Sequence, residues 1–281
     1  MTVRIVTDSG ADIPKELAEE LKIEVVPLTV SFGSETFQDG ISLSGDDFYY
    51  RLTHEEIMPT TSQPSVGSFV EVYKKIKDSS DEILSIHLSS KLSGTLNSAT
   101  QAAAEENLES GIRLLDSQAA SMGLGFSVLA AAEAAKNGAS LEDASAIATS
   151  VLKRTHLFIL FDTLKFLEKG GRIGKARALM GNILNLKPIL TLEDGEIAKK
   201  LQARSFRKGI QSLHQLIEDC GALETLAVLY TTDPEEARNL GDRLSNLIVG
   251  DKKPMVVRIS PAVGAHGGPG VVGVVCVTAK T

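Results

Sequence analysis

Short apolar runs alternate with longer amphipathic stretches through the first half of the chain. The apolar runs predict buried strands at residues 3–7, 24–30, 83–88 and 112–115. Helical periodicity between and after them predicts helices at 14–21, 46–52, 66–77, 95–106 and 119–135. A small hairpin is expected at 32–37. Such alternation indicates a parallel sheet covered by helices on both faces.

The second half has a different pattern. It predicts a helix at 141–153, a strand at 157–161, and a hairpin of 188–192 and 197–202 joined by Asp194 and Gly195. A helix at 207–219, a strand at 226–231 and a helix at 234–247 follow, and two strands at 255–259 and 271–278 close the chain. We therefore expect a two-lobed α/β fold with a parallel-sheet lobe over 1–155, a mixed-sheet lobe over 156–281, and a ligand cleft between them.

Composition and charge narrow the classes of function. The 281 residues carry a net charge of -7, which argues against a nucleic-acid groove because such grooves need clustered Lys and Arg. No apolar run approaches the roughly 20 residues of a membrane span. Cys220 and Cys276 form no CxxC pair. Together with an N-terminus that runs directly into a strand, they predict two reduced thiols in a cytoplasmic protein.

Three loops could carry chemistry, and each follows or joins strands, where ligands bind in open α/β sheets. The first is residues 60–65, Thr-Thr-Ser-Gln-Pro-Ser, which precedes the helix expected from residue 66. The second is residues 89–95, in which Ser93 is expected to cap the following helix and Gly94 to permit a close backbone approach. The third is residues 264–270, a glycine-rich turn that carries His266.

Capping and ligand binding remain alternatives for the hydroxyls of the first two loops. Ser and Thr are common at helix starts as caps alone. The same position, however, offers unpaired main-chain N–H groups and a hydroxyl, which together suit an anion. Such donors would hold a carboxylate even without a basic residue.

A set of motifs along nearly the whole chain resembles the DegV family. They are TDSGADIP (7–14), TSQPS (61–65), SSKLSGT (89–95), FLEKGGRIG (166–174), LNLKPIL (184–190) with the DGE turn, and AHGGPGVVGV (265–274). The resemblance implies one DegV (EDD-fold) domain over residues 3–279. It also implies a protein that binds a long-chain fatty acid, and in some members a carrier subunit of an ATP-dependent fatty-acid kinase. That kinase makes an acyl phosphate for phospholipid synthesis.

The resemblance also implies site residues. The family's head-group contacts fall on Thr61 and Ser93 of this sequence, and Ser62, Gly94 and His266 are expected as neighbours. Arg172, in FLEKGGRIG, is expected near the ligand or partner face, with a direct carboxylate contact as the lesser alternative. A nucleotide-binding role for this G-x-x-G spacing lacks a preceding strand of the Rossmann kind and a downstream acid.

The hydrocarbon tail would supply most of the affinity. About fifteen methylenes at ~0.8 kcal/mol each give roughly 12 kcal/mol before the entropic costs of binding. The candidate lining of the tail pocket is apolar, and comprises Phe158, Leu160, Phe166, Ile173, Leu179, Met180, Ile183, Leu184 and part of the stretch 119–130. These residues could equally be ordinary core.

Other functions are less well supported by the motifs. None of the five His forms HExxH or another close ligand pair, so neither a metal nor any other cofactor is expected. His87 lies in an apolar strand and is expected to be a satisfied core residue. A hydrolase or phosphoryl-transfer enzyme using Asp8 or Ser93 is the alternative, although Asp8 lacks the second aspartate of D-x-D and is expected to brace a loop. A scaffold protein with an incidental lipid is a further alternative, and transient contact with a membrane surface is compatible with a lipid carrier.

Overall fold

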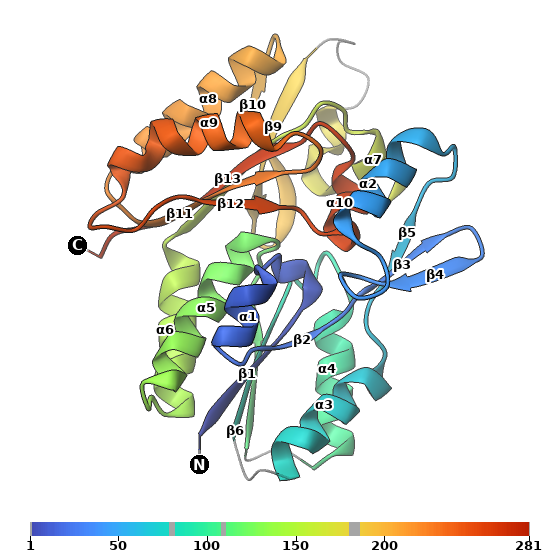
Figure 1. Cartoon of the computed structure of the whole chain (residues 1–281), viewed down its shortest axis with the longest axis vertical. Coiled ribbons are helices and arrows are strands. Elements are labelled where there is room, and N and C mark those ends of the chain that lie inside the picture. The colour runs from blue at the N-terminus through green and yellow to red at the C-terminus, as the bar shows by residue number, and fades with distance from the viewer. Residues whose placement is uncertain (1, 79–81, 108–110, 180–185, 281) are drawn as a thin grey trace.

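The first half of the chain forms a four-stranded parallel sheet. The computed structural model describes residues 2–78, 82–107, 111–179 and 186–280. The strands run in the order β2 (Glu24–Val26), β1 (Val3–Asp8), β6 (Glu82–His87) and β7 (Ile112–Asp116), and all three pairings are parallel. Helices cover both faces of this sheet, as expected (Figure 1).

Alternating side chains assign the strands of this sheet to two cores. Val6 and Ile83 pack against α3 (Val66–Asp78) and α4 (Thr95–Glu105) on one face. Ile5 and Leu84 face the opposite side and pack against α1 (Lys15–Glu20), α5 (Met122–Lys136) and α6 (Leu141–Lys153). This is the double-sided burial that continuous apolar strands of a parallel sheet require.

The second half forms a six-stranded mixed sheet in the order β10-β9-β8-β13-β11-β12, in which only β11 and β12 are parallel among the paired neighbours. The strands are β8 (Thr155–Leu160), β9 (Lys187–Glu193), β10 (Glu196–Ala203), β11 (Leu223–Tyr230), β12 (Met255–Arg258) and β13 (Val272–Thr278). Helices α8 (Phe206–Glu218) and α9 (Pro234–Leu244) pack on one face (Figure 1).

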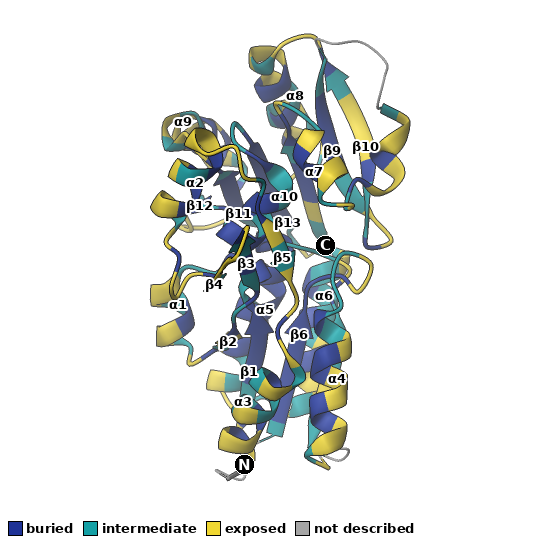
Figure 2. Ribbon diagram, turned by 90° about the vertical axis from the view of Figure 1, so that its right-hand side faces the viewer, coloured by how far each residue is buried: buried dark blue, intermediate teal, exposed yellow. Residues whose placement is uncertain are grey.

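The other face of the six-stranded sheet packs against the first lobe. Met122 and Leu124 of α5 share one buried cluster with Ile5 of β1, Leu157 at β8 and Val275 of β13. Figure 2 shows α5 as a largely buried helix. Both lobes therefore bury their facing surfaces in a common core.

A third, three-stranded sheet lies beside the interface of the lobes. Its order is β4 (Glu35–Gln38), β3 (Thr29–Phe32) and β5 (Thr60–Ser62). It shares a cluster with α2 (Gly45–His54) and α10 (Pro261–Gly267), in which Phe32, Phe48 and Ala265 are buried. The remaining short helices are η1 (Ser9–Ala11), α7 (Lys165–Lys169), η2 (Gly174–Leu179) and η3 (Ser245–Leu247).

Local sequence signals for turns and caps are confirmed at several places. Asp194 and Gly195 join β9 to β10 with φ of 51° and 79°, the left-handed conformation that a two-residue hairpin turn requires. Ser44 Oγ accepts the Asp47 N–H at 3.1 Å and caps α2.

Three expectations about local structure are wrong. The strand expected at 24–30 is divided into β2 and β3, which belong to different sheets. Residues 60–62 are strand β5 rather than a loop at a helix start, because they pair with β3. The region of His266 is helix α10 rather than a turn. None of the helices in the described part of the chain combines the length and the hydrophobicity of a membrane span.

Candidate functional site

A cavity of about 410 Å³ lies between the two lobes. Its wall is mostly apolar and takes residues from both lobes and from α10. Its polar residues include Thr61, Ser62, Gln63, Ser93, Arg172 and His266. The structure therefore brings five of the six residues expected from the motifs to one cavity, and Gly94 is the exception.

Thr61 is held in place by the imidazole of His266. Thr61 lies in β5, opposite Val30 of β3, and its Oγ1 is 2.7 Å from His266 Nε2. The two residues are 205 positions apart in the sequence. The pairing of β5 with β3 therefore fixes the position of Thr61 beside α10. An unpaired loop would not fix that position.

His266 is a neutral imidazole at neutral pH. Burial, and then the Arg172 guanidinium nearby, lower the pKa of His266 to about 4. Its Nδ1 is buried without a hydrogen-bond partner among the described residues and faces Gly170, where a Cβ would lie only 2.2 Å away. With the proton on Nε2, His266 donates to Thr61 Oγ1 and leaves the Thr61 hydroxyl proton to point at an acceptor in the cavity.

Ser93 is backed by a second hydroxyl in a similar way. Its Oγ is 2.9 Å from Oγ1 of Thr95, which is fully buried. The expectation that Ser93 caps the helix is wrong, since α4 begins at Thr95 and its N-cap position is Gly94. A hydrogen bond donated by Thr95 leaves the Ser93 proton for an acceptor in the cavity.

Gly94 does not line the cavity but makes room for a residue that does. A Cβ at Gly94 would lie 1.9 Å from Oε1 of Gln63, so no larger residue fits there without moving Gln63. Gln63 itself donates from Nε2 to Ser98 Oγ at 2.8 Å. Gln63 belongs to the TSQPS motif but was not among the expected site residues. The sequence signal for it is Gly94, whose missing Cβ leaves room for the Gln63 side chain.

Arg172 is the cationic group of the cavity wall. Its Nε donates to the Leu92 carbonyl at 3.1 Å and its Nη1 to the Gly170 carbonyl at 2.8 Å. These bonds to both lobes fix the guanidinium beside His266. Arg172 therefore supplies the positive charge that the hydroxyl groups lack.

The predicted tail lining is partly wrong, because β8 presents its other set of side chains. Leu157, Ile159 and Phe161 line the cavity, whereas Phe158 and Leu160 point to the opposite face and pack in the core under α8 and α9. One residue of register along a strand exchanges the two faces.

The other predicted lining residues have different outcomes. Phe166 packs in the cluster of α2 and α10, and Ile173 and Leu179 belong to the shared core. Of the stretch 119–130, Ala120 and Ser121 line the cavity. Met180, Ile183 and Leu184 lie outside the described residues.

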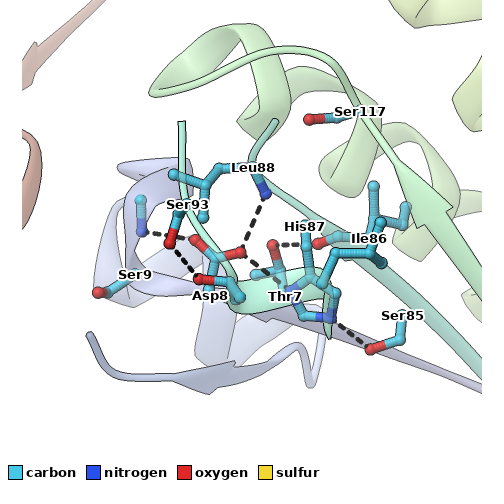
Figure 3. A network of polar contacts seen from close by, with 12 residues as sticks. Thr7, Asp8, Ser9, Ser85, Ile86, His87, Leu88, Ser93 and Ser117 are labelled. Atoms are coloured by element: carbon cyan, nitrogen blue, oxygen red, sulfur yellow. Dashed lines mark hydrogen bonds and ion pairs between the residues drawn. The ribbon is translucent and has the colours of Figure 1, made fainter. Parts of the chain in front are cut away.

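Asp8 and His87 form a buried network outside the cavity lining (Figure 3). Asp8 Oδ1 accepts the Gly10 N–H at 3.0 Å, and Oδ2 accepts the Leu88 N–H at 3.1 Å and contacts His87 Nδ1 at 2.9 Å. His87 Nε2 bonds Ser85 Oγ at 2.7 Å. Asp8 is thus the loop-bracing residue that the sequence suggested, and His87 is a satisfied core residue.

Two further carboxylates are buried beside the start of α10. Burial raises the pKa of Asp12 to about 7 and that of Asp39 to about 6. Neither Asp39 oxygen has a partner in hydrogen-bond geometry among the described residues. The nearby Ser9 hydroxyl and Ala262 N–H lower the pKa of Asp39, but less than burial raises it.

These raised pKa values predict that stability falls as pH rises. A carboxyl with a pKa of 3.8 unfolded and about 6 folded stabilises the fold below pH 3.8, and this contribution is lost as pH rises through 6. In Asp39→Asn we expect the free energy of unfolding, relative to wild type, to rise by about 2 kcal/mol between pH 4.5 and 8. Urea denaturation at stepped pH measures this, with exposed Asp251→Asn as control. A pH-independent difference would contradict it.

The described residues contain no group of three or more His, Cys, Asp or Glu side chains that could hold a metal ion. Cys276 is buried and Cys220 is half-buried, and neither forms a disulfide.

Comparisons with known proteins agree in the family they find. The family model described as "Uncharacterised protein, DegV family" matches residues 2–279. Protein DegV of Bacillus subtilis is 35% identical over 283 residues, which cover 98% of each chain. Its crystal structure, described as that of a fatty acid binding protein, has a TM-score of 0.88 at 32% identity over 99% of this chain and 100% of that one.

Two other solved structures are similar. A DegV family protein from Thermus thermophilus, described by its fatty acid binding, has a TM-score of 0.91 and 33% identity, and covers 99% of this chain and 100% of its own. A stearic acid-binding protein from Eubacterium ventriosum has a TM-score of 0.89 and 25% identity over 98% of each chain.

Proposed function

The chain belongs to the DegV family, and on this premise we propose that it binds a long-chain fatty acid in the cavity between its lobes. One observation carries the proposal: Thr61, Ser93, His266 and Arg172 line the same cavity as a large set of apolar side chains. A ligand with one anionic end and a long hydrocarbon fits such a wall. The similar proteins described as fatty acid binding support the same ligand class.

The head group would be held by donors that are already oriented. Thr61 and Ser93 each have a buried partner able to donate to their oxygen, His266 and Thr95 respectively. Both hydroxyl protons are then directed to the carboxylate, and Arg172 neutralises its charge. The ionised acid is therefore preferred over neutral lipids of the same length.

The tail would fill the apolar part of the cavity. Residues from β8, β9, β10 and α10 line it, including Leu157, Ile159, Leu190, Ile197 and Val263. Burial of each methylene contributes about 0.8 kcal/mol. The tail thus supplies affinity, and the polar residues supply selectivity for the acid.

Replacing both hydroxyl-bearing residues tests the head-group assignment. We expect Thr61→Val combined with Ser93→Ala to lower fatty-acid affinity at least about 100-fold, since each hydrogen bond to a charged group contributes roughly 1.5–3 kcal/mol and the pair therefore about 3 kcal/mol or more. Mass spectrometry of denatured protein and titration with a fluorescent fatty acid measure retention.

A matched control is Thr100→Val combined with Ser212→Ala. These hydroxyls bond main-chain carbonyls within helices and do not line the cavity. Wild-type affinity in the Thr61 and Ser93 double variant would refute the assignment. Absence of any fatty acid binding by the wild-type protein would refute the function itself.

We further propose that the protein is a carrier and not an enzyme, and that it presents the fatty acid to an ATP-dependent fatty-acid kinase in the cytoplasm. The acyl phosphate would enter phospholipid synthesis. The family resemblance supports this step, and the internal bonding of Asp8 disfavours a nucleophilic role for that residue. Incubation of the loaded protein with ATP, with and without such a kinase, tests it. Acyl phosphate formed without the kinase would contradict a carrier role.

A further inference from the structure

The carboxylate of Asp12 joins two separate parts of the cavity wall without lining the cavity itself. Asp12 follows η1 and is buried. Its Oδ2 accepts a hydrogen bond from Ser121 Oγ, and its Oδ1 accepts the Ser260 N–H at 3.0 Å. Ser121 precedes α5, and Ser260 precedes α10, so one side chain bonds the starts of two helices that lie 139 residues apart.

Ser121 is a strained residue of the cavity wall. Its φ of 53° and ψ of −149° lie outside the regions that residues with a Cβ normally occupy. Such a conformation costs on the order of 1–3 kcal/mol and persists only where the surroundings enforce it. Here the Ser121 N–H donates to the Gly10 carbonyl at 2.7 Å, and Ser121 Oγ donates to Asp12. The bond to Asp12 thus helps hold this part of the wall.

Ser260 immediately precedes α10, the helix that carries His266 into the cavity wall beside Thr61. The helix is seven residues long, and its residues Ala262, Val263, His266 and Gly267 all line the cavity. It is tightly enclosed, because a Cβ at Gly264 would lie 2.2 Å from Tyr49 Oη. Because the helix is so short and His266 bonds Thr61, we expect a shift at Ser260 to displace His266 and through it Thr61.

We propose that Asp12 is a positioning residue of the head-group site: by bonding Ser121 and Ser260 it holds α10, and with it His266, in the place where His266 orients Thr61. The proposal rests on the proposed function, because it concerns the same cavity. It adds a residue that touches neither the ligand nor any residue expected to bind the carboxylate.

Asp12→Asn separates positioning from general packing. Asparagine keeps the size of the side chain, but with its oxygen on the Ser260 N–H its amide must donate to Ser121 Oγ, so the Ser121 hydroxyl proton loses its acceptor. Affinity is measured for palmitate and for methyl palmitate, which has the same tail without an anionic head. We expect affinity for palmitate to fall about tenfold and affinity for the ester to change less than twofold. The imidazole NMR signals of His266, assigned with His266→Gln, should shift.

Ser121→Ala removes only the bond to the α5 side and provides a second variant should Asp12→Asn fold poorly. We expect the same selective loss for palmitate, about threefold. The matched control is Asp251→Asn, at an exposed aspartate. Equal loss of both ligands would show that Asp12 only supports packing, and unchanged affinity for both would overturn the proposal. Failure of the proposed function would show differently, as wild-type protein that does not bind palmitate.

Discussion

Asp8→Asn is expected to lower the free energy of unfolding by about 3 kcal/mol. The carboxylate of Asp8 is fully buried and accepts two main-chain N–H groups, from Gly10 and Leu88, besides its contact with His87. Asparagine has one acceptor oxygen, so at least one of these N–H groups faces an amide NH₂ and is left unsatisfied. Each buried unsatisfied donor costs roughly 1–3 kcal/mol, and a repulsive donor contact adds to this.

Asp116→Asn is the matched control for this change. Asp116 ends β7, the strand beside β6, and its carboxylate likewise accepts loop N–H groups, from Ser90 after β6 and Gln118 after β7. It is only half-buried, so water can replace a lost bond, and we expect a loss of no more than about 1 kcal/mol. Urea denaturation followed by circular dichroism measures both variants. Equal, small losses would show that the Asp8 network does not brace the fold.

The same experiment bears on catalysis. A nucleophilic Asp8 would have to reach a substrate, but both of its oxygens are occupied by groups of its own chain and the residue has no exposed surface. A variant that keeps wild-type stability but loses turnover of ester or phosphate substrates would favour the hydrolase or phosphoryl-transfer alternative. A destabilised variant with unchanged fatty-acid affinity per folded molecule fits a structural role.

Much of the fold could be predicted because its signals are local. The strand at Val3–Asp8 has Val3, Ile5 and Val6 in a short β-branched stretch, and the Asp194–Gly195 turn needs only two residues with positive φ. The resemblance to a family also indicated Thr61, Ser93, His266 and Arg172 without any knowledge of their distance in space. The structure places these four at one cavity.

The elements that were missed depend on contacts far away in the sequence. Strand β5 is polar and three residues long, and only its pairing with β3 makes it a strand. Helix α10 contains glycines at 264 and 267, which disfavour helices, but Gly264 allows the helix to approach Tyr49 closely. The intrinsic preferences of neighbouring residues do not predict either contact, because the partners β3 and Tyr49 lie far away in the sequence.

The prediction of the tail lining was wrong for a different reason. Both faces of β8 are buried, so hydrophobicity identifies neither as the face of the cavity. Phe158 and Leu160 were expected in the lining as apolar residues, whereas the cavity takes the alternate set with Leu157 and Ile159. Only the packing of α8 and α9 on the far side of the sheet decides between them.

Leu192→Asp is expected to lower affinity for a long-chain fatty acid at least about 100-fold. Leu192 of β9 lines the cavity and is half-buried, opposite Ile197 of β10. In the empty cavity the new carboxylate can remain hydrated, so the fold tolerates it. Entry of a hydrocarbon tail removes that water, and an unpaired charge in an apolar environment costs several kcal/mol.

Leu201→Asp is the matched control, because Leu201 lies on the adjacent strand with 40% of its surface exposed and does not line the cavity. Titration with a fluorescent fatty acid should show wild-type affinity for Leu201→Asp, and circular dichroism should show both variants folded. Equal affinities in the two folded variants would mean that the hydrocarbon tail does not lie in the part of the cavity lined by Leu192.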